Sequence, residues 1–330
     1  MNDKQINTFL LILTFAILLI VLEVGIRTNY SLSPELYYLL KNYPGDRKDK
    51  MLNFYFEPNS IRDHYGINTY VNSIGIRDKE YTKKKPPNVT RIAIIGDSFT
   101  FGYGVENDSD VYSEVLEKKL GDNYEVINFG MGSLNALDIY YVVKEKIIPY
   151  NPDVIIYGYF HNDPEFRKDE IHVPIQYCFQ DSNIFYSYYW INARLHNLKY
   201  NLFSQEDAYY DYVKFIHSDD SIEQQCMKNI IYNYDKVAKN TTFIIFVIPE
   251  EHESFITNIV ENRIEHLTEG TNIHFLSISG EFWNITQSRE KGYYKVDYPR
   301  DQHFNEKGHE LIADILYRKL QGKMVNVSRQ

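Results

Sequence analysis

A serine and a histidine that lie far apart in the chain are the residues whose types most clearly suggest chemistry. Ser98 stands in a Gly-Asp-Ser-Phe segment directly after the apolar run 91–95, and His303 stands in the segment Asp-Gln-His-Phe-Asn. A serine hydroxyl is a weak nucleophile at neutral pH and needs a base within hydrogen-bond reach. Histidine suits that task, and a carboxylate such as Asp301 can hold its other nitrogen and fix the tautomer. Together they predict acyl-ester chemistry with Ser98 as nucleophile, His303 as base and Asp301 as the orienting acid.

Each of these residues also has a purely structural interpretation. A Gly-Asp-Ser segment is a common turn, and serine is a frequent N-cap of helices. His303 precedes a helical pattern for which Asn305 is a plausible N-cap. Asp297 is a second candidate for the acid, and His309 lies inside the helical pattern, where we expect a packed or surface side chain rather than the base.

Two further segments could donate hydrogen bonds to an oxyanion. The segment 128–133 contains Gly130 and Gly132, which lack a side chain and let a backbone N–H approach a ligand. Asn162, in a His-Asn-Asp segment, carries a side-chain N–H that is a good oxyanion donor. The alternatives are an ordinary glycine-rich turn and an Asx turn that closes a strand. A phosphate loop at 102–104 is disfavoured, because the sequence has no Gly-x-x-x-x-Gly-Lys-Ser/Thr pattern.

Alternating strand and helix patterns surround these segments and predict the frame that positions them. Near-continuous apolar strands that alternate with helices are typical of a parallel sheet covered on both faces. We expect a three-layer α/β/α sandwich with a parallel, flavodoxin-like sheet and a site at the carboxyl ends of its strands. Ser109 or Asp110 is the expected cap of the first helix. The expected strands are 91–95, 124–129, 154–159, 242–248 and 273–278, and the expected helices are 111–120, 136–150, 222–237, 255–267 and 306–320.

The N-terminal part of the chain departs from this pattern. Residues 9–22 form an apolar run that, extended to Ile26, is long enough to cross a bilayer, with Glu23 near its end. A signal peptide would want a small-residue cleavage site, which is unconvincing here. A buried core helix is disfavoured because the run is apolar on every face and lies at the extreme N-terminus. We expect a membrane anchor over 1–28, a wrapping segment over 29–89 and a main domain over 90–323. Residues 164–219 are expected to form an insertion or cap, whose aromatic stretch 186–190 could stack on sugar rings or pack as part of the cap.

Charge and cysteine content narrow the function classes. The 330 residues carry a formal net charge of −10, which argues against the basic footprint of a nucleic-acid binder. Cys178 and Cys226 match no zinc or redox spacing and are interpreted as isolated thiols. A disulfide is the alternative if the domain faces an oxidising compartment.

The motifs, taken in order, resemble the SGNH (GDSL-type) hydrolase family over residues 72–320. GDSFTFGYGV is similar to the first block of the family, NFGMGS to the second, HND to the third and DQHFNEKGHELIA to the last. Departures are Arg300 where the family usually has the acid, with Asp301 one position later, and Phe160 where the third block usually has glycine. The segment VNSIGIRD and the Glu23–Arg27 region after the apolar run resemble the branch with an N-terminal membrane segment.

This resemblance implies an esterase or O-acyltransferase that acts on a small-molecule or glycan acyl ester without metal or organic cofactor. Ser98 would be the nucleophile, His303 the base, and Gly132 or Gly130 together with Asn162 would complete the oxyanion hole. It also favours a catalytic domain outside the cytoplasm. The rival hypotheses are a non-catalytic scaffold or binding module on the same fold, and a flavodoxin-like nucleotide binder.

Overall fold

The computed structural model describes residues 3–30, 56–64, 67–132, 134–165, 188, 191, 195, 205–237, 240–250, 254–296, 301 and 303–327. The chain divides into two compact units. One comprises Met1–Asp46 and Phe166–Asn229, and the other comprises Arg47–Glu165 and Ile230–Gln330. All five predicted site residues belong to the second unit. The predicted boundaries of the anchor, wrapping segment, main domain and insertion stay predictions.

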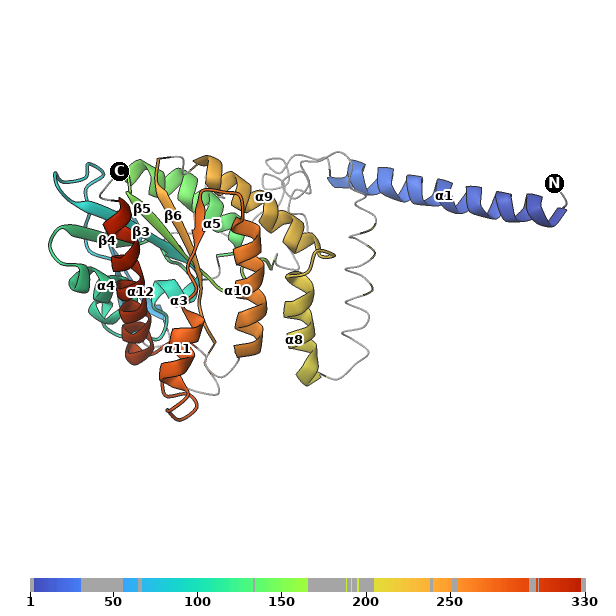
Figure 1. The fold of residues 1–330 in the computed structure, drawn as a ribbon. Helices are drawn as coiled ribbons and strands as arrows, with labels where there is room; N and C mark the ends of the chain where they lie inside the picture. The colour runs from blue at the N-terminus through green and yellow to red at the C-terminus, as the bar shows by residue number, and fades with distance from the viewer. Residues whose placement is uncertain are drawn as a thin grey trace. The chain divides into compact units, whose positions relative to one another are not determined.

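A five-stranded parallel sheet forms the centre of the second unit (Figure 1). Its strands lie in the order β4-β3-β5-β6-β7, so the second strand of this sheet along the chain, β4, lies at the edge beside the first, β3. This 2-1-3-4-5 order is that of flavodoxin-like sheets. The strands span Thr90–Gly96 (β3), Tyr124–Asn128 (β4), Val154–Tyr159 (β5), Thr242–Val247 (β6) and Ile273–Phe275 (β7).

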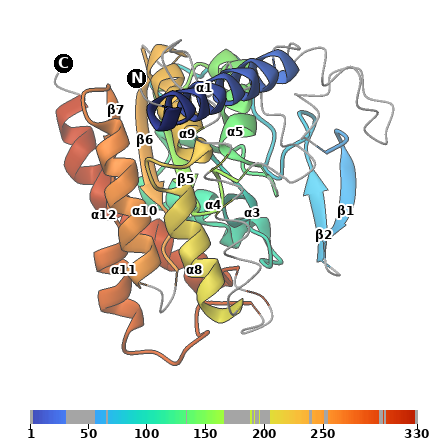
Figure 2. The ribbon, with the colours of Figure 1, turned by 90° about the vertical axis from the view of Figure 1, so that its right-hand side faces the viewer.

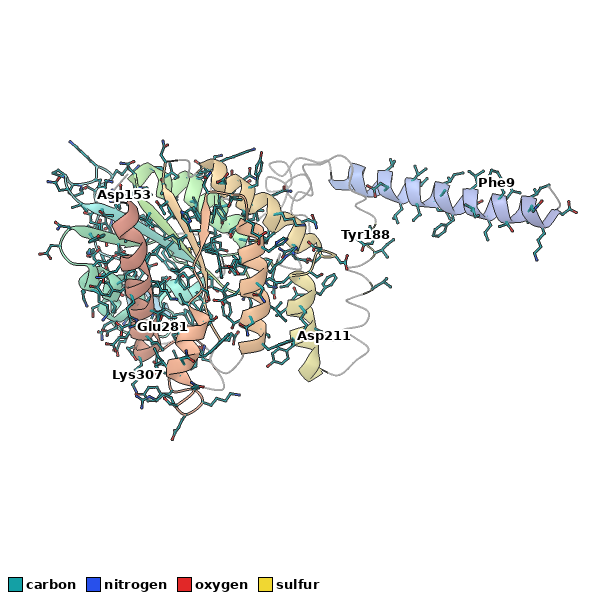
Figure 3. All side chains as sticks on the ribbon, viewed as in Figure 1. Phe9, Asp153, Tyr188, Asp211, Glu281 and Lys307 are labelled. Atoms are coloured by element: carbon teal, nitrogen blue, oxygen red, sulfur yellow. The ribbon has the colours of Figure 1, made fainter. Side chains whose placement is uncertain are left out.

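Helices cover both faces of the sheet, which confirms the expected α/β class. On one face, alternate strand residues pack against α4 (Tyr112–Leu120), α11 (Ser279–Thr286) and α12 (Glu306–Val327). Helices α4 and α12 lie side by side there (Figure 1). An ion pair between Glu281 of α11 (Figure 3) and Arg318 of α12 joins these two helices, with a nitrogen–oxygen distance of 2.6 Å. On the other face, Tyr234 in the second half of α9 (Ile222–Val237) packs on Tyr157 and Phe243 of the sheet.

The helix after β4 is less regular than the sequence pattern predicts. Helix α5 spans Ala136–Val142 and begins with a capping box in which Asn135 accepts from the N–H of Asp138. A π-helical turn, Val143–Ile147, and a 3-10 turn, Ile148–Tyr150, follow it. Pro149 lies in this last turn and has no N–H to donate to a regular α-helix. The expected helix is therefore present, but its second half is π-helical and 3-10 rather than α-helical.

Other elements differ from expectation at their ends. The cap predicted for α4 at Ser109 or Asp110 is wrong, because Asp108–Asp110 form a 3-10 turn and the N-cap is Val111, without a side-chain bond. Strand β7 ends three residues early, as an edge strand that pairs with β6 alone. Helix α10 (Ser254–Thr268) follows the predicted helix closely. Helix α12 begins at the predicted residue and continues seven residues beyond the predicted end, and α11 is absent from the prediction.

An antiparallel hairpin precedes the sheet and has no counterpart in the sequence analysis (Figure 2). Its strands are Ser60–His64 (β1) and Ile67–Val71 (β2). The burial alternates along the second strand, with Thr69 and Val71 buried and Asn68 and Tyr70 exposed. This five-residue alternation is too short to stand out within a polar segment.

The first unit contains a long apolar helix, α1 (Asp3–Tyr30), whose large side chains such as Phe9 are exposed (Figure 3). Its 23 residues from Asp3 to Gly25 are long and apolar enough to cross a membrane, as a membrane anchor or a signal peptide would be. The unit also contains α8 (Gln205–Ile216). Of the aromatic stretch 186–190, only Tyr188 is described; it is exposed and donates to Asp220.

The cysteine interpretation changes with the structure. Cys226 is disulfide-bonded rather than an isolated thiol. Cys178 lies outside the described residues.

Candidate active site

Ser98 lies at the carboxyl end of β3, where the fold predicts a site. It is the first residue of the short helix α3 (Ser98–Phe101), and the N-cap of that helix is Asp97. The Asp97 carboxylate accepts from the N–H of Phe99 at 2.9 Å. The cap is thus supplied by the residue before Ser98, and the interpretation of Ser98 as a simple N-cap is wrong.

The imidazole of His303 reaches this serine from a point 205 residues further along the chain. Its Nε2 lies 2.8 Å from the Ser98 hydroxyl oxygen, and its Nδ1 lies 2.7 Å from Oδ1 of Asp301. A proton on Nδ1 satisfies the carboxylate and leaves Nε2 free to accept the serine proton. The geometry is that of a nucleophile, a base and an orienting acid.

The two-residue spacing between Asp301 and His303 has a local structural basis. Oδ1 of Asp301 accepts both the backbone N–H of His303, at 2.8 Å, and the ring Nδ1–H. An aspartate that bonds the N–H two residues on forms an Asx turn, which holds its carboxylate beside the following side chain. Arg300 and the reserve acid Asp297 lie outside the described residues.

A short antiparallel pairing fixes the backbone of His303. The N–H of Val296 donates to the carbonyl of His303, and the N–H of Asn305 donates to that of Tyr294, both at 3.0 Å. Asn305 is the cap of α12, as predicted, because its Oδ1 accepts from the N–H groups of residues 307 and 308. Its side-chain N–H donates to the carbonyls of Tyr293 and Lys295. His303 is therefore held by the cap on one side and by the paired segment on the other.

Burial and neighbouring charges tune the base. The His303 ring packs between Phe99 and Tyr103, with centroid distances of 4.7 and 4.8 Å. Burial lowers the pKa of His303, Lys295 adds to that effect, and Asp301 opposes both. Burial alone would raise the pKa of Asp301, but the hydrogen bonds from the His303 backbone and ring hold it below its ordinary value. At neutral pH this combination favours a neutral imidazole beside an ionised carboxylate.

This electrostatic setting predicts the pH dependence of turnover. The base must be neutral to accept the serine proton, so kcat/KM should rise with pH as His303 loses its own proton. Because the pKa of His303 is lowered from 6.5, we expect the midpoint of that rise below 6.5 and a plateau at about pH 7. Initial rates of aryl acetate hydrolysis from about pH 4.5 to about 8 would measure it. A midpoint at or above 6.5 would contradict the assignment of the acid limb to His303 in this environment.

The two candidate oxyanion glycines play different parts. A Cβ placed on Gly130 would come within 2.6 Å of the backbone of Thr100 and Phe101, so this glycine is needed for close packing against α3. A Cβ placed on Gly132 would have one near neighbour, the Cβ of Ser98, at 3.9 Å. The N–H groups of Ser98 and Gly132 donate no hydrogen bond to any other described residue. Gly132 is therefore the glycine placed beside the serine.

The same contrast predicts how alanine is tolerated at these glycines. We expect Gly130→Ala to lower the free energy of unfolding by about 1–3 kcal/mol, because backbone atoms must shift to admit the methyl group. Gly132→Ala meets ordinary space and should unfold at nearly the wild-type temperature. Thermal unfolding of both variants, followed by circular dichroism, provides the measurement. Equal destabilisation by the two substitutions would contradict the different packing of the two glycines.

Asn162 lies in the turn after β5 and is exposed. Among the described residues, its side chain has no hydrogen-bond partner, which leaves its N–H available to a substrate. The turn is closed by the next residue, because Asp163 accepts from the N–H of Phe160 at 3.0 Å and from the Tyr157 hydroxyl at 2.6 Å. The carboxylate of Asp163 thus bonds a residue three positions earlier rather than the N–H two residues on, so this is not the expected Asx turn. Asn162 is presented at the strand end by the turn that Asp163 closes.

A buried polar cluster beside the serine was missed by the sequence analysis. Nδ1 of His161 lies 3.1 Å from a carboxylate oxygen of Glu250, which follows β6. Burial alone would raise the pKa of Glu250, but the hydrogen bond and charge of His161 hold it below its ordinary value. Lys295 is buried with its ammonium 4.3 Å from the centre of the Phe304 ring. Burial raises the pKa of Asp97 to about 7 against the opposing effect of His161. Isolated Glu and Lys residues outside any motif carry no signal in the sequence.

The structure also shows the positions of His309 and of the glycine segment that was disfavoured as a phosphate loop. His309 is fully buried and accepts the N–H of Tyr112 at 3.2 Å, as expected for a packed histidine. Burial lowers its pKa to about 3. Gly102, within the disfavoured phosphate loop, is the left-handed C-cap of α3. Among the described residues, no group of three or more His, Cys, Asp or Glu is placed to hold a metal ion.

Comparison with solved structures finds similar chains at TM-scores below 0.5. The structural neighbours of this chain are lipases and esterases of the SGNH (GDSL) type, at low sequence identity. One is a putative lipolytic protein of the G-D-S-L family from Desulfitobacterium hafniense, with 17% identity, a TM-score of 0.41 and coverage of 69% of this chain and 98% of that chain. Another is a psychrotrophic esterase from Pseudoalteromonas, with 13% identity, a TM-score of 0.43 and coverage of 72% and 99%. A third is a lipase/acylhydrolase from Enterococcus faecalis, with 13% identity, a TM-score of 0.44 and coverage of 71% and 97%.

These likenesses concern the fold and assign no role to any residue. No family model matches the chain, and no curated protein matches it. The membrane-anchored branch of the family stays a prediction.

Proposed function

We propose that this protein is a serine-dependent acyl-ester hydrolase or O-acyltransferase that acts on an acylated carbohydrate or lipid. The observation that carries the proposal is the continuous hydrogen-bonded series Ser98–His303–Asp301, with distances of 2.8 and 2.7 Å. A non-catalytic scaffold has no need for this alignment. The alignment therefore favours catalysis over the rival binding module.

In the first step, the Ser98 oxygen attacks the ester carbonyl while its proton passes to Nε2 of His303. Asp301 keeps the ring in the required tautomer and stabilises the imidazolium that forms. The carbonyl oxygen becomes an oxyanion, which the N–H groups of Ser98 and Gly132 and the side chain of Asn162 stabilise. Collapse of this intermediate breaks the ester bond, and the leaving alcohol takes the proton from His303.

In the second step, an acceptor hydroxyl attacks the acyl group on Ser98. His303 takes the proton of the acceptor as the new bond forms. When the second tetrahedral intermediate collapses, the bond between the acyl group and the Ser98 oxygen breaks, and His303 returns the proton to that oxygen. Water as acceptor makes the protein a hydrolase, and a sugar hydroxyl makes it a transferase. Acetate release with and without a glycan acceptor separates them: a transferase releases less free acetate and yields an acetylated glycan when the acceptor is added.

The apolar helix α1 supports a membrane location. Its 23 residues from Asp3 to Gly25, most of them apolar, rise about 1.5 Å each and so span about 35 Å, enough for a hydrocarbon core of about 30 Å. A signal peptide is the alternative. The disulfide at Cys226 supports an oxidising surrounding, outside the cytoplasm, for the unit that contains this cysteine.

A membrane-impermeant fluorophosphonate probe tests both the activity and the location. The probe reacts only with an activated serine, so we expect labelling of the wild type on intact cells and no labelling of Ser98→Ala. The exposed Ser109 makes a matched control, and Ser109→Ala should label like the wild type. Absence of labelling in folded, purified protein would refute the enzyme proposal. Labelling only after lysis would be consistent with the enzyme proposal and would refute the external location.

A further inference from the structure

Arg77, in the segment between the hairpin and the sheet, is bound to the loop that follows the serine. Arg77 is 4% exposed, and its guanidinium donates to the carbonyls of Gly102 and Val105, each at 2.7 Å, and to Asp108 at 2.6 Å. It also lies 5.4 Å from the ring centre of Phe101 in α3. The same loop is tied to the nucleophile, because the N–H of residue 103 donates to the carbonyl of Ser98 at 3.0 Å. Arg77 therefore fixes the far end of the turn that carries Ser98.

Asp78, the next residue, is bound to the other half of the site. Its Oδ2 accepts the N–H of Asn128, the last residue of β4, at 2.7 Å. Asn128 in turn donates from its side chain to the carbonyl of Thr100, at 2.9 Å, and accepts the N–H of Gly130, at 2.9 Å. Asn128 thus joins α3 to the glycine segment, and Asp78 holds Asn128 in place.

A self-braced turn presents the two side chains together. Asn72 is fully buried, and its Oδ1 accepts from the N–H groups of Ile74 and Ile76 at 3.0 and 3.2 Å. Its side-chain N–H donates to the carbonyl of Lys79 at 2.8 Å. The backbone on both sides of Arg77 and Asp78 is thereby fixed to one asparagine.

We propose that Arg77 and Asp78 are positioning residues that set the separation between the two backbone donors of the oxyanion hole, the N–H groups of Ser98 and Gly132. The inference rests on the function proposed above and extends it to residues outside the triad. One side chain locks the segment that carries Ser98, and the other locks the segment that carries Gly132. Donors aimed at a developing oxyanion act through fixed geometry, and a misplacement of about 1 Å can cost about 100-fold in rate.

Arg91 provides a matched control for Arg77. It is fully buried, donates to the carbonyls of Tyr150 and Lys83 at 2.6 and 3.1 Å, and pairs with Glu125. It lies near the start of β3, five residues before Gly96, which corresponds to about 17 Å of strand. Loss of Arg91 should destabilise the fold as the loss of Arg77 does. It should not change the positions of the Ser98 and Gly132 N–H groups.

The test compares Arg77→Lys with Arg91→Lys in the full chain. A lysine keeps the charge but lacks the planar set of donors that bonds several carbonyls at once. We expect both variants to unfold at lower temperature, and only Arg77→Lys to lower kcat for aryl acetate, by about 10- to 100-fold, with KM changed less than about threefold. Equal kcat in the two variants would overturn the proposal. If Arg77→Lys does not fold, Asp78→Ala, which removes the acceptor of the Asn128 N–H, takes its place, with the same expected fall in kcat against Arg91→Lys.

Hydrogen exchange measures the positioning without turnover. In Arg77→Lys, peptides covering 98–106 should exchange faster than in the wild type, and in Arg91→Lys they should not. Equal exchange of these peptides in the two variants would refute the positioning role, whether or not the protein hydrolyses esters. A wild type that fails to label with fluorophosphonate would instead refute the proposed function, so the two failures are distinguishable.

Discussion

Replacement of Ser98 by alanine is expected to lower kcat for hydrolysis of a small aryl acetate by on the order of 10³ or more. The hydroxyl oxygen lost in this variant is the one that lies 2.8 Å from Nε2 of His303. Without it no acyl-enzyme can form, and only the oxyanion donors and the binding contacts remain to assist direct attack by water. Steady-state kinetics of the purified protein provide the measurement.

Two comparisons make this result specific to the proposed mechanism. Ser98→Ala should unfold near the wild-type temperature, because the helix cap is supplied by Asp97 and not by Ser98. The double variant Ser98→Ala/His303→Ala should be about as slow as Ser98→Ala alone, because residues that act as one unit are not additive. Retention of wild-type kcat in folded Ser98→Ala would remove the serine from its role.

Asp301→Asn is expected to lower kcat by about 10²- to 10⁴-fold while the fold is kept. The asparagine oxygen can still accept the N–H of His303, so the turn survives. The negative charge that stabilises the imidazolium is lost, and the amide group can hold the ring in the wrong tautomer. Because the Asp301 carboxylate raises the pKa of His303 against burial, its removal should also move the acid limb of the pH profile to lower pH.

A surface ion pair offers a matched control for this substitution. Asp314 of α12 pairs with Lys119 of α4 at 2.6 Å and is about as exposed as Asp301. We expect Asp314→Asn to leave kcat and the pH profile unchanged, since exposed pairs contribute little. If kcat in Asp301→Asn stays within about tenfold of the wild type, the orienting acid must be another carboxylate, and Asp297 becomes the first to examine.

Several features of the site were predictable because they depend on neighbours in the sequence. Apolar runs of strand length between helical patterns predict a parallel sheet, and the glycine that ends β3 places Ser98 at its carboxyl end. The Asn305 cap is also a local event, involving the N–H groups of the next turn. The predicted cap of α4 was wrong for a local reason too, because residues 108–110 form a 3-10 turn instead.

Choices between equivalent candidates were not predictable. Gly130 and Gly132 have the same type and nearly the same place in the sequence, and only the approach of the Thr100–Phe101 backbone shows which of them is needed for packing. The sequence favoured Asp301 as the acid with Asp297 as a second candidate, and only the structure shows that Asp301 bonds both the backbone and the ring of His303. Arg77 and Glu250 have partners that are distant in sequence, so no local pattern marks them.

The sequence by itself determined the class of fold, the apolar helix at the N-terminus, and the types and order of the residues able to carry acyl transfer. The tertiary structure alone decided that Ser98 and His303 meet, which glycine lies beside the serine, and that Arg77 and Asp78 hold the two loops. The physical reason is range. Helix caps and strand patterns follow from residues a few positions apart, whereas a hydrogen bond across 205 residues depends on the order of the strands and the packing of every helix between them.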